Sequence, residues 1–403
     1  MSLEAAQNLA ERLLKSDFVE VYGHHDADGI AAASIIGHAL HRAGVRFSVS
    51  IRSRIVPSDI GRAEQALLCD MGSSLPDLSE EVMVIDHHMP VFEGPFHVNP
   101  RIDGIDGEQD LCASALAFLV AAEMGDNRDL CGLALVGMIG DRQPSAGKNR
   151  EIISEGIANG YLKVRKSLRL SGSTMQERLS TALYPYLKGI SGNEAVSKRL
   201  VENATQDGEI DMGLLLSGVI LESAPNANTD ALYNVYGDCY GLEKEAIHDA
   251  CDLAALLEAC GQAGKGGLGV ALCLRSHDVI DEAWQTALAY QKAVISAVQT
   301  ASRLDEHLPI WTVEDKSNVS GVADALTYDG LNTGPIFVAA QADDCWYLSG
   351  RAPPSWDKSL AELFTGIAAQ CGGIGGGHRL RAGLKIPADK FGCLKDGIAE
   401  VIA

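Results

Sequence analysis

The sequence Val82-Met83-Val84-Ile85-Asp86-His87-His88 joins a short apolar run directly to three polar side chains. Four consecutive apolar residues predict a fully buried strand of the kind found in parallel sheets. The carboxylate and the two imidazoles then fall at the carboxyl end of that strand, which is the edge where open α/β sheets bind ligands. This stretch therefore predicts a buried strand that carries metal-type ligands to a binding edge.

Two similar junctions lie upstream. Val19-Glu20-Val21-Tyr22 leads into Gly-His-His-Asp-Ala-Asp-Gly at residues 23–29, and the apolar run 66–69 leads into Asp70. Helix-favouring residues at 30–42, an alternating strand at 47–51 and helical spacing at 111–124 and 130–139 surround these junctions. Short strands alternating with helices predict an α/β fold with a doubly wound, mostly parallel sheet covered on both sides.

The chain is 403 residues long, which is too long for one ordinary core. We expect a catalytic domain over 1–165, a mainly helical, acidic intermediate region over 166–304 and a smaller α/β domain over 305–403. A long helical pattern at 281–304 predicts a connector helix between lobes. In the last domain we expect strands near 335–340 and 346–348, a glycine cluster, and a helix over 388–402.

The composition is that of a globular protein, with 46% apolar and 22% charged residues. The amino terminus has no signal pattern, and no apolar run reaches membrane-spanning length, so we expect a cytoplasmic protein with no membrane contact. The ten cysteines include no C-x-x-C pair, which predicts free thiols rather than a disulfide framework or a zinc ribbon.

The net charge is −21, and about half of the excess lies in the middle of the chain. Residues 202–258 contain 12 acidic side chains and one basic side chain, Lys244. Phosphate binding depends on lysine and arginine contacts, so this segment is a poor surface for a polyanion. It is either a solvated face or a surface for a basic partner.

The polar residues at the strand ends form a mixed set of carboxylates and imidazoles. Asp26 and Asp28 are one residue apart, so an extended chain directs both carboxylates to the same side. A structural zinc prefers four Cys or His ligands, whereas this mixed set suits a pair of Mn²⁺ or Mg²⁺ ions bridged by a carboxylate. Two such ions about 3.5–4 Å apart can activate a hydroxide for attack on a phosphodiester. The candidate metal ligands are His24, Asp26, Asp28, Asp70, His87 and Asp141.

Four motifs in this order resemble those of the DHH phosphoesterase superfamily: His24-His25-Asp26-Ala27-Asp28-Gly29, Asp70, Asp86-His87-His88 and Asp141. The glycine-rich stretch 372–379 and the preceding Leu348-Ser349-Gly350-Arg351 resemble the DHHA1 domain that usually accompanies the DHH domain. The resemblance implies two Mn²⁺ ions, with Mg²⁺ possible, and Asp70 as their bridge. It also implies that Asp86 orients His87 and that His88 faces the scissile phosphate, so Asp70, Asp86 and His88 are the expected catalytic residues. In the second domain, the residues expected to hold phosphate or sugar are Arg351, Gly375, Gly376, Gly377, His378 and Arg379.

The His-His-Asp-Ala-Asp-Gly form and the lack of an evident OB-fold module look most like archaeal RecJ-like proteins, including the GINS-associated nucleases. This resemblance implies a Mn²⁺-dependent exonuclease that removes nucleotides from an end of single-stranded DNA or RNA, with a replication protein such as GINS as a possible partner. One alternative is a phosphodiesterase for oligoribonucleotides or cyclic dinucleotides, which the acidic surface favours. A second is a replication-fork scaffold without chemistry, which is disfavoured because every expected metal position is occupied. A family II pyrophosphatase is disfavoured because its tail lacks the glycine signature.

Overall fold

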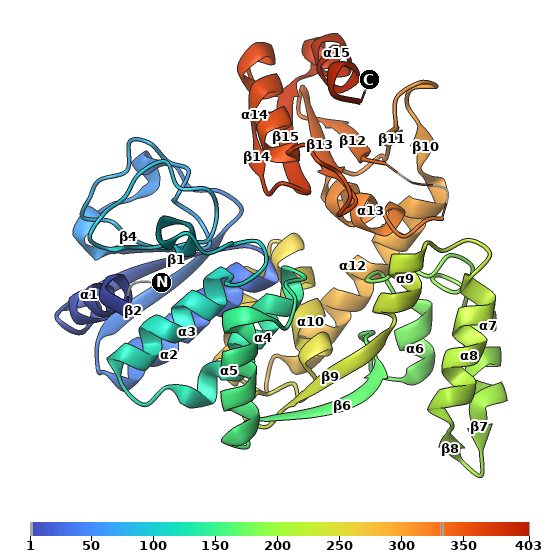
Figure 1. Ribbon diagram of the computed structural model, residues 1–403, viewed down its shortest axis with the longest axis horizontal. Helices are drawn as coiled ribbons and strands as arrows, with labels where there is room; N and C mark the ends of the chain where they lie inside the picture. Colours follow the sequence, from blue (N-terminus) through green and yellow to red (C-terminus); the bar gives the residue numbers. More distant parts are fainter. Residues whose placement is uncertain (1–2, 331, 333, 403) are drawn as a thin grey trace. The chain divides into compact units, whose positions relative to one another are not determined.

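The computed structural model describes residues 3–330, 332 and 334–402 and divides into two compact units (Figure 1). The first consists of Met1–Arg165 and Asp238–Ala287, and the second consists of Lys166–Gly237 and Leu288–Ala403. The chain therefore passes from the first unit to the second and returns before it enters the second again. Residues 166–304, expected as one intermediate region, are distributed over both units.

The first unit contains a sheet of five parallel strands in the order β2-β1-β3-β4-β5, which confirms the expected fold class. The strands are β1 (Phe18–His24), β2 (Arg46–Arg52), β3 (Ala66–Cys69), β4 (Met83–Ile85) and β5 (His97–Val98). The strand order reverses between β1 and β3, and ligands bind outside the carboxyl ends of the strands at such a switch point. Cys69 lies beside Gly23 on one side and Ile85 on the other, so the turns after β1, β3 and β4 are neighbours.

Helices cover one face of this sheet, and loops cover much of the other. The helices of the unit are α1 (Leu3–Leu14), α2 (Ala27–Arg42), α3 (Ala113–Met124), α4 (Cys131–Gly140), α5 (Gly147–Ala158), α10 (Ala250–Gln262) and α11 (Gly266–Cys273). Helices α2 and α3 contact the strands, and α4, α10 and α11 pack around α2. On the opposite face, Leu68 and Val84 belong to an apolar cluster completed by loop residues such as Ile60 and Phe92. The 3-10 helices η1 (Pro57–Asp59) and η2 (Ala63–Gln65) lie in these loops.

The second unit contains a six-stranded sheet in the order β10-β11-β12-β13-β15-β14. Only β11 and β12 pair in parallel within it. Its strands are β10 (Ser302–Arg303), β11 (Ile310–Thr312), β12 (Ile336–Ala342), β13 (Cys345–Arg351), β14 (Ile374–Gly377) and β15 (Arg381–Pro387). Along β12, Val338 faces the cluster that includes α13 (Val319–Leu326), and Phe337 faces the cluster that includes α14 (Leu360–Cys371) and α15 (Phe391–Ile402). The period of two along β12 thus places helices on both faces.

The rest of the second unit is mainly helical around its own small core. It comprises α6 (Met175–Ser180), α7 (Glu194–Ala204), α8 (Met212–Ser223) and α9 (Thr229–Asn234), with a small hairpin of β7 (Thr205–Gln206) and β8 (Glu209–Ile210). The expected long helix is α12 (Ile280–Thr300), which contributes residues to both units. Strands β6 (Leu162–Leu168) and β9 (Tyr236–Leu242) form a two-stranded ribbon in a region that the sequence had indicated to be largely helical.

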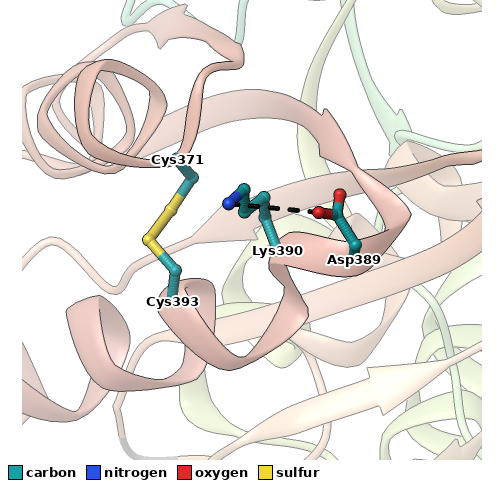
Figure 2. Close-up of a disulfide and its surroundings, with 4 residues drawn as sticks. All are labelled: Cys371, Asp389, Lys390 and Cys393. Carbon is teal, nitrogen blue, oxygen red and sulfur yellow. Dashed lines mark ion pairs between the residues drawn. A yellow bond between two sulfur atoms is a disulfide. The ribbon is translucent and has the colours of Figure 1, made fainter.

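A disulfide joins Cys371 at the end of α14 to Cys393 in α15 (Figure 2). The expectation that all cysteines are free thiols is wrong for this pair, while the other eight are free. The Cα atoms of Cys371 and Cys393 are 6.2 Å apart although the two residues are separated by 22 positions in the sequence. The intervening β14–β15 hairpin brings them together, and local spacing contains no sign of that.

Among the described residues, no helix has both the length and the apolar character needed to cross a membrane.

Candidate active site

The turn after β1 places His24 and Asp26 together. Asp26 caps the N-terminus of α2, where its Oδ1 accepts a hydrogen bond from Gly29 N at 2.9 Å. Its Oδ2 lies 2.7 Å from His24 Nδ1. A Cβ atom on Gly29 would be 2.6 Å from the Cβ of His24, so the turn closes tightly only with glycine there. The sharp turn into α2 thus fixes one carboxylate and one imidazole at the sheet edge.

Asp28 is fully buried and is held by the N-terminus of α3. Its Oδ2 accepts a hydrogen bond from Ala113 N at 2.7 Å, and its Oδ1 accepts one from Ser114 N at 2.9 Å. Backbone amides at a helix N-terminus stabilise negative charge. Burial and the nearby Asp70 carboxylate nevertheless raise the pKa of Asp28 to about 6. Two helices are therefore needed to position this carboxylate: α2 supplies it and α3 anchors it.

Asp70 lies at the centre of the cluster and has an unusual backbone conformation, with φ of +60°. Asp tolerates the left-handed region better than most residues, but a non-glycine residue there is uncommon and often marks a functional site. Its Oδ2 is 3.2 Å from His24 Nδ1, and its Oδ1 is 3.2 Å from His87 Nε2. Among the described residues, the buried Oδ1 has no hydrogen-bond partner.

The Asp86 carboxylate is buried and accepts four hydrogen bonds. Oδ1 accepts from the backbone amides of His87 and His88 and lies 2.7 Å from His88 Nδ1, while Oδ2 accepts from Ser73 N. These contacts keep the pKa of Asp86 well below its usual value despite burial, which by itself raises it. Asp86 thus contacts the His87 backbone amide and the His88 ring. The Gly107 carbonyl, 2.6 Å from Nδ1, holds the His87 ring.

His87 connects Asp70 to Asp141, the residue that follows α4. Its Nε2 lies 3.2 Å from Asp70 Oδ1, 3.2 Å from Asp141 Oδ2 and 3.9 Å from Asp28 Oδ2. Burial lowers the pKa of His87, but the surrounding carboxylates outweigh it and the pKa is raised well above its usual value. Burial and the Asp28 carboxylate raise the pKa of Asp141 well above its usual value. All six expected metal ligands are therefore brought together in the first unit.

The cluster fits a pair of divalent cations. In one group, His24, Asp26 and Asp70, and in another, Asp28, Asp70 and His87, the candidate ligand atoms lie within 4.8 Å of one another. Asp70 belongs to both groups, and it also belongs to a third with Asp86 and His88. Closely spaced buried carboxylates repel one another unless a cation or protons neutralise them. Oxygen and imidazole donors with one shared carboxylate match Mn²⁺ or Mg²⁺.

In the second unit, the Arg351 guanidinium is engaged by a buried acid. Its Nε is 2.5 Å from Asp324 Oδ1 and its Nη2 is 3.2 Å from Asp324 Oδ2. Arg351 is 6% exposed, and its Nη1 also donates to Ser349 Oγ. The exposed side of this contact is bordered by Arg381, whose Nη2 is 3.4 Å from Asp324 Oδ2. The Arg351 guanidinium, which was expected to hold phosphate, therefore binds the Asp324 carboxylate.

The glycine cluster forms β14, the edge strand beside β15, rather than an open loop. A Cβ on Gly375 would be 2.4 Å from Phe364 O, and one on Gly377 would be 2.5 Å from Arg381 O, so both glycines are required for packing. Gly376 has no atom within 4 Å of a Cβ position and leaves a smooth, open surface. Beyond the strand, His378 N donates to Arg381 O, and Arg379 donates to Trp356 O at 2.5 Å.

Several residues that support the cluster gave no signal in the sequence. Ser73 donates its backbone amide to Asp86 and places its Oγ 2.8 Å from His97 Nε2. Asn99 and Arg101 hold the backbone carbonyls of His88 and His87 at 2.9 and 2.8 Å. Because most of these contacts go to main-chain atoms, the residue types alone do not predict them.

Residues 19–138 match the family model described as the DHH family, N-terminal domain. An uncharacterized protein of Methanocaldococcus jannaschii is 25% identical over 96% of this chain and 93% of its own length. The single-stranded-DNA-specific exonuclease RecJ of Bacillus subtilis is 27% identical, over 43% of this chain and 26% of its own length. The chain thus matches only about a quarter of that RecJ.

Solved structures share the fold at lower identity. RecJ from Thermus thermophilus in complex with Mn²⁺ superposes with a TM-score of 0.60 at 19% identity, covering 98% of this chain and 54% of that one. CDC45 from Entamoeba histolytica gives a TM-score of 0.65 at 14% identity, covering 99% and 98%.

Residues 19–138 thus match the DHH domain, which is characteristic of a superfamily of phosphoesterases. The sequence relatives of the chain include RecJ, and RecJ structures share its fold, so the chain is RecJ-like in sequence and in fold.

Proposed function

We propose that the chain is a Mn²⁺-dependent exonuclease that hydrolyses phosphodiester bonds at an end of single-stranded DNA or RNA. The observation that carries this proposal is the position of Asp70, whose two oxygens face two different ligand groups. His24 and Asp26 would hold one cation, and Asp28, His87 and Asp141 would hold the other, with Asp70 shared. Two cations held in this way supply an activated water and stabilise the leaving oxygen of a phosphodiester.

His88 is the side chain proposed to meet the scissile phosphate. Its Nδ1 is directed at Asp86 Oδ1, so its Nε2 lies on the opposite side of the ring. The side chain is 25% exposed, whereas that of His87 is 1% exposed. A hydrogen-bonded, partly exposed imidazole beside a metal cluster is suited to contact an anionic oxygen or to transfer a proton. Asp86 fixes that ring and is proposed to act through it.

An arginine at the carboxyl edge of the sheet supports an anionic substrate. Arg52 is exposed, and among the described residues its side chain forms no ion pair or hydrogen bond. Arg52 lies opposite His24 in the pairing of β1 with β2, which places it next to the cluster. An exposed cation beside the cluster is suited to attract an anionic ligand.

The second unit is proposed to hold the neighbouring phosphate or sugar. Gly376 offers an open backbone surface, and the hairpin after it carries His378 and Arg379. Arg351 is proposed to act through Asp324, which it shares with Arg381. A phosphate would then meet Arg381 and the β14 backbone before it meets Arg351.

The test is cleavage of end-labelled DNA and RNA strands of several lengths with Mn²⁺, Mg²⁺ or EDTA. Wild type is expected to shorten single strands only with a divalent cation. Asp70→Asn is expected to lose this activity, while Asp126→Asn, at an exposed carboxylate paired with Arg128, serves as the matched control. Absence of metal-dependent cleavage of any strand by wild type would contradict the proposal.

The charge distribution favours a second candidate, a phosphodiesterase for oligoribonucleotides or cyclic dinucleotides. Residues 202–258 carry 12 acidic side chains against one basic side chain, which disfavours binding of a long polyanion there. Comparing rates on dinucleotides and on long oligonucleotides separates the two candidates, since a preference for long strands supports the exonuclease. A replication partner such as GINS belongs to the exonuclease proposal, and a contact through this acidic segment predicts a complex that dissociates at high salt.

A further inference from the structure

The segment that follows β5 wraps around the Asp86-His87-His88 turn. We name residues 99–107 the brace; it begins at Asn99, passes through the 3-10 helix η3 (Pro100–Asp103) and ends at Gly107. Asn99 is buried, and its Nδ2 donates to both His88 O and Ser73 Oγ at 2.9 Å. Its Oδ1 accepts from Arg101 N, so the whole amide is engaged. The brace is therefore anchored to the turn at its first residue.

Arg101 makes the second contact between the brace and the turn. Its Nε donates to His87 O at 2.8 Å, and its Nη2 lies 3.4 Å from Glu108 Oε1. A planar guanidinium held at two points cannot rotate freely, so the peptide that it grips is fixed. The carbonyl of His87 is thus held by a charged donor at the residue whose side chain enters the metal cluster.

The third contact sets the protonation of the His87 ring. Gly107 O lies 2.6 Å from His87 Nδ1, and a carbonyl oxygen only accepts, so Nδ1 carries the proton. The same carbonyl accepts a second hydrogen bond from Gln143 Nε2 at 2.8 Å. Asn149 is buried and donates to Gln143 Oε1 at 2.9 Å, which fixes the direction of the Gln143 amide. A Cβ on Gly107 would lie 2.4 Å from His87 O, so the brace can approach the His87 backbone this closely only with glycine at position 107.

We infer that Arg101 and Gln143 are positioning residues for the metal cluster, acting through the His87 backbone and through Gly107 O to hold the His87 ring with Nε2 directed at Asp70 and Asp141. This inference rests on the proposed function. A metal-binding imidazole coordinates through one nitrogen, and the hydrogen bond at its other nitrogen sets the tautomer and the ring angle. Loss of such supporting contacts typically weakens metal affinity about 10- to 100-fold.

The experiment measures Mn²⁺ affinity by calorimetry for wild type, Arg101→Met, Arg101→Lys and Gln143→Glu. Gln143→Glu is nearly isosteric but places an oxygen against Gly107 O. The matched control is Arg128→Met, because Arg128 is exposed and pairs with Asp126 beside it. We expect Arg101→Met and Gln143→Glu to bind Mn²⁺ about 10- to 100-fold more weakly. Arg101→Lys, which retains a donor, is expected to recover part of the loss, and Arg128→Met to match wild type.

A second measurement needs no variant. In wild type loaded with Mg²⁺ and labelled with ¹⁵N-histidine, the His87 ring is expected to carry its proton on Nδ1. A proton on Nε2, or Mn²⁺ affinities of Arg101→Met and Gln143→Glu equal to that of Arg128→Met, would overturn the inference. Wild type that binds Mn²⁺ but cleaves no nucleic acid would contradict the proposed function. The inference about Arg101 and Gln143 would then be decided by the Mn²⁺ affinities of their variants alone. Wild type that binds no divalent cation would overturn both.

Discussion

The contact between α4 and Asp28 makes a quantitative prediction for Gly137→Ala. A Cβ on Gly137 would be 2.0 Å from Ser114 Oγ and 2.2 Å from Asp28 Oδ1. Neither atom can move easily, because Asp28 accepts two amides of α3 and Ser114 Oγ donates to Ala134 O. Replacing a helix-interior glycine by alanine gains about 1 kcal/mol of helix propensity. Overpacking costs about 1–3 kcal/mol, and each hydrogen bond to a charged group that is broken costs about 1.5–3 kcal/mol more.

With one such hydrogen bond broken, we therefore expect Gly137→Ala to lower the free energy of unfolding by about 1.5–5 kcal/mol. It should also weaken Mn²⁺ binding, because Asp28 is displaced from α3. The matched control is Gly132→Ala in the same helix, where the nearest atom, Leu242 Cδ2, would be an ordinary 3.4 Å away. That variant should be as stable as wild type or about 1 kcal/mol more stable. Thermal and urea unfolding by circular dichroism, with calorimetric Mn²⁺ titration, measure both effects. Equal stability and equal Mn²⁺ affinity of the two variants would refute the close approach of α4 to Asp28.

Three further predictions concern other parts of the molecule. Burial raises the pKa of Asp129, but the guanidiniums of Arg42 and Arg275 outweigh this effect and lower the pKa to about 2. The contribution of the Asp129 carboxylate to the free energy of unfolding is therefore present above pH 4 and lost as the pH falls toward 2. After allowance for screening by solvent, Asp129→Asn should lower the free energy of unfolding by about 1–2 kcal/mol at neutral pH and by almost nothing near pH 2 in urea unfolding; a loss of stability independent of pH would contradict this. Replacing Cys371 and Cys393 by serine should lower the stability of the second unit by about 3 kcal/mol, an effect that dithiothreitol should reproduce in wild type and not in the variant. Adding Mn²⁺ at about 100 times its Kd should stabilise wild type by about 2.7 kcal/mol and should shift the melting temperature of Asp70→Asn much less; equal shifts would speak against Asp70 as the shared ligand.

Local patterns in the sequence predicted several elements of the first unit and singled out the polar side chains that meet at its sheet edge. The apolar runs before Asp70 and Asp86 become β3 and β4, and the helix-favouring residues after Asp28 become α2. These predictions succeed because strand and helix periodicities repeat over a few residues and depend on the side chains themselves. The parallel order then follows from the alternation of strands and helices, so the meeting of the three ligand turns at one edge could be anticipated.

The tertiary structure alone decided how each ligand is held. Asp28 is anchored by α3, which begins 85 positions later, and the His87 ring is set by the Gly107 carbonyl. Likewise, Arg351 is engaged by Asp324, and the Cys371–Cys393 disulfide closes across a hairpin. Contacts of this kind join main-chain groups or distant side chains, and their geometry is set by how whole elements pack. The sequence thus determined which chemical groups reach the sheet edge, while packing determined which of their atoms remain directed at the centre of the cluster.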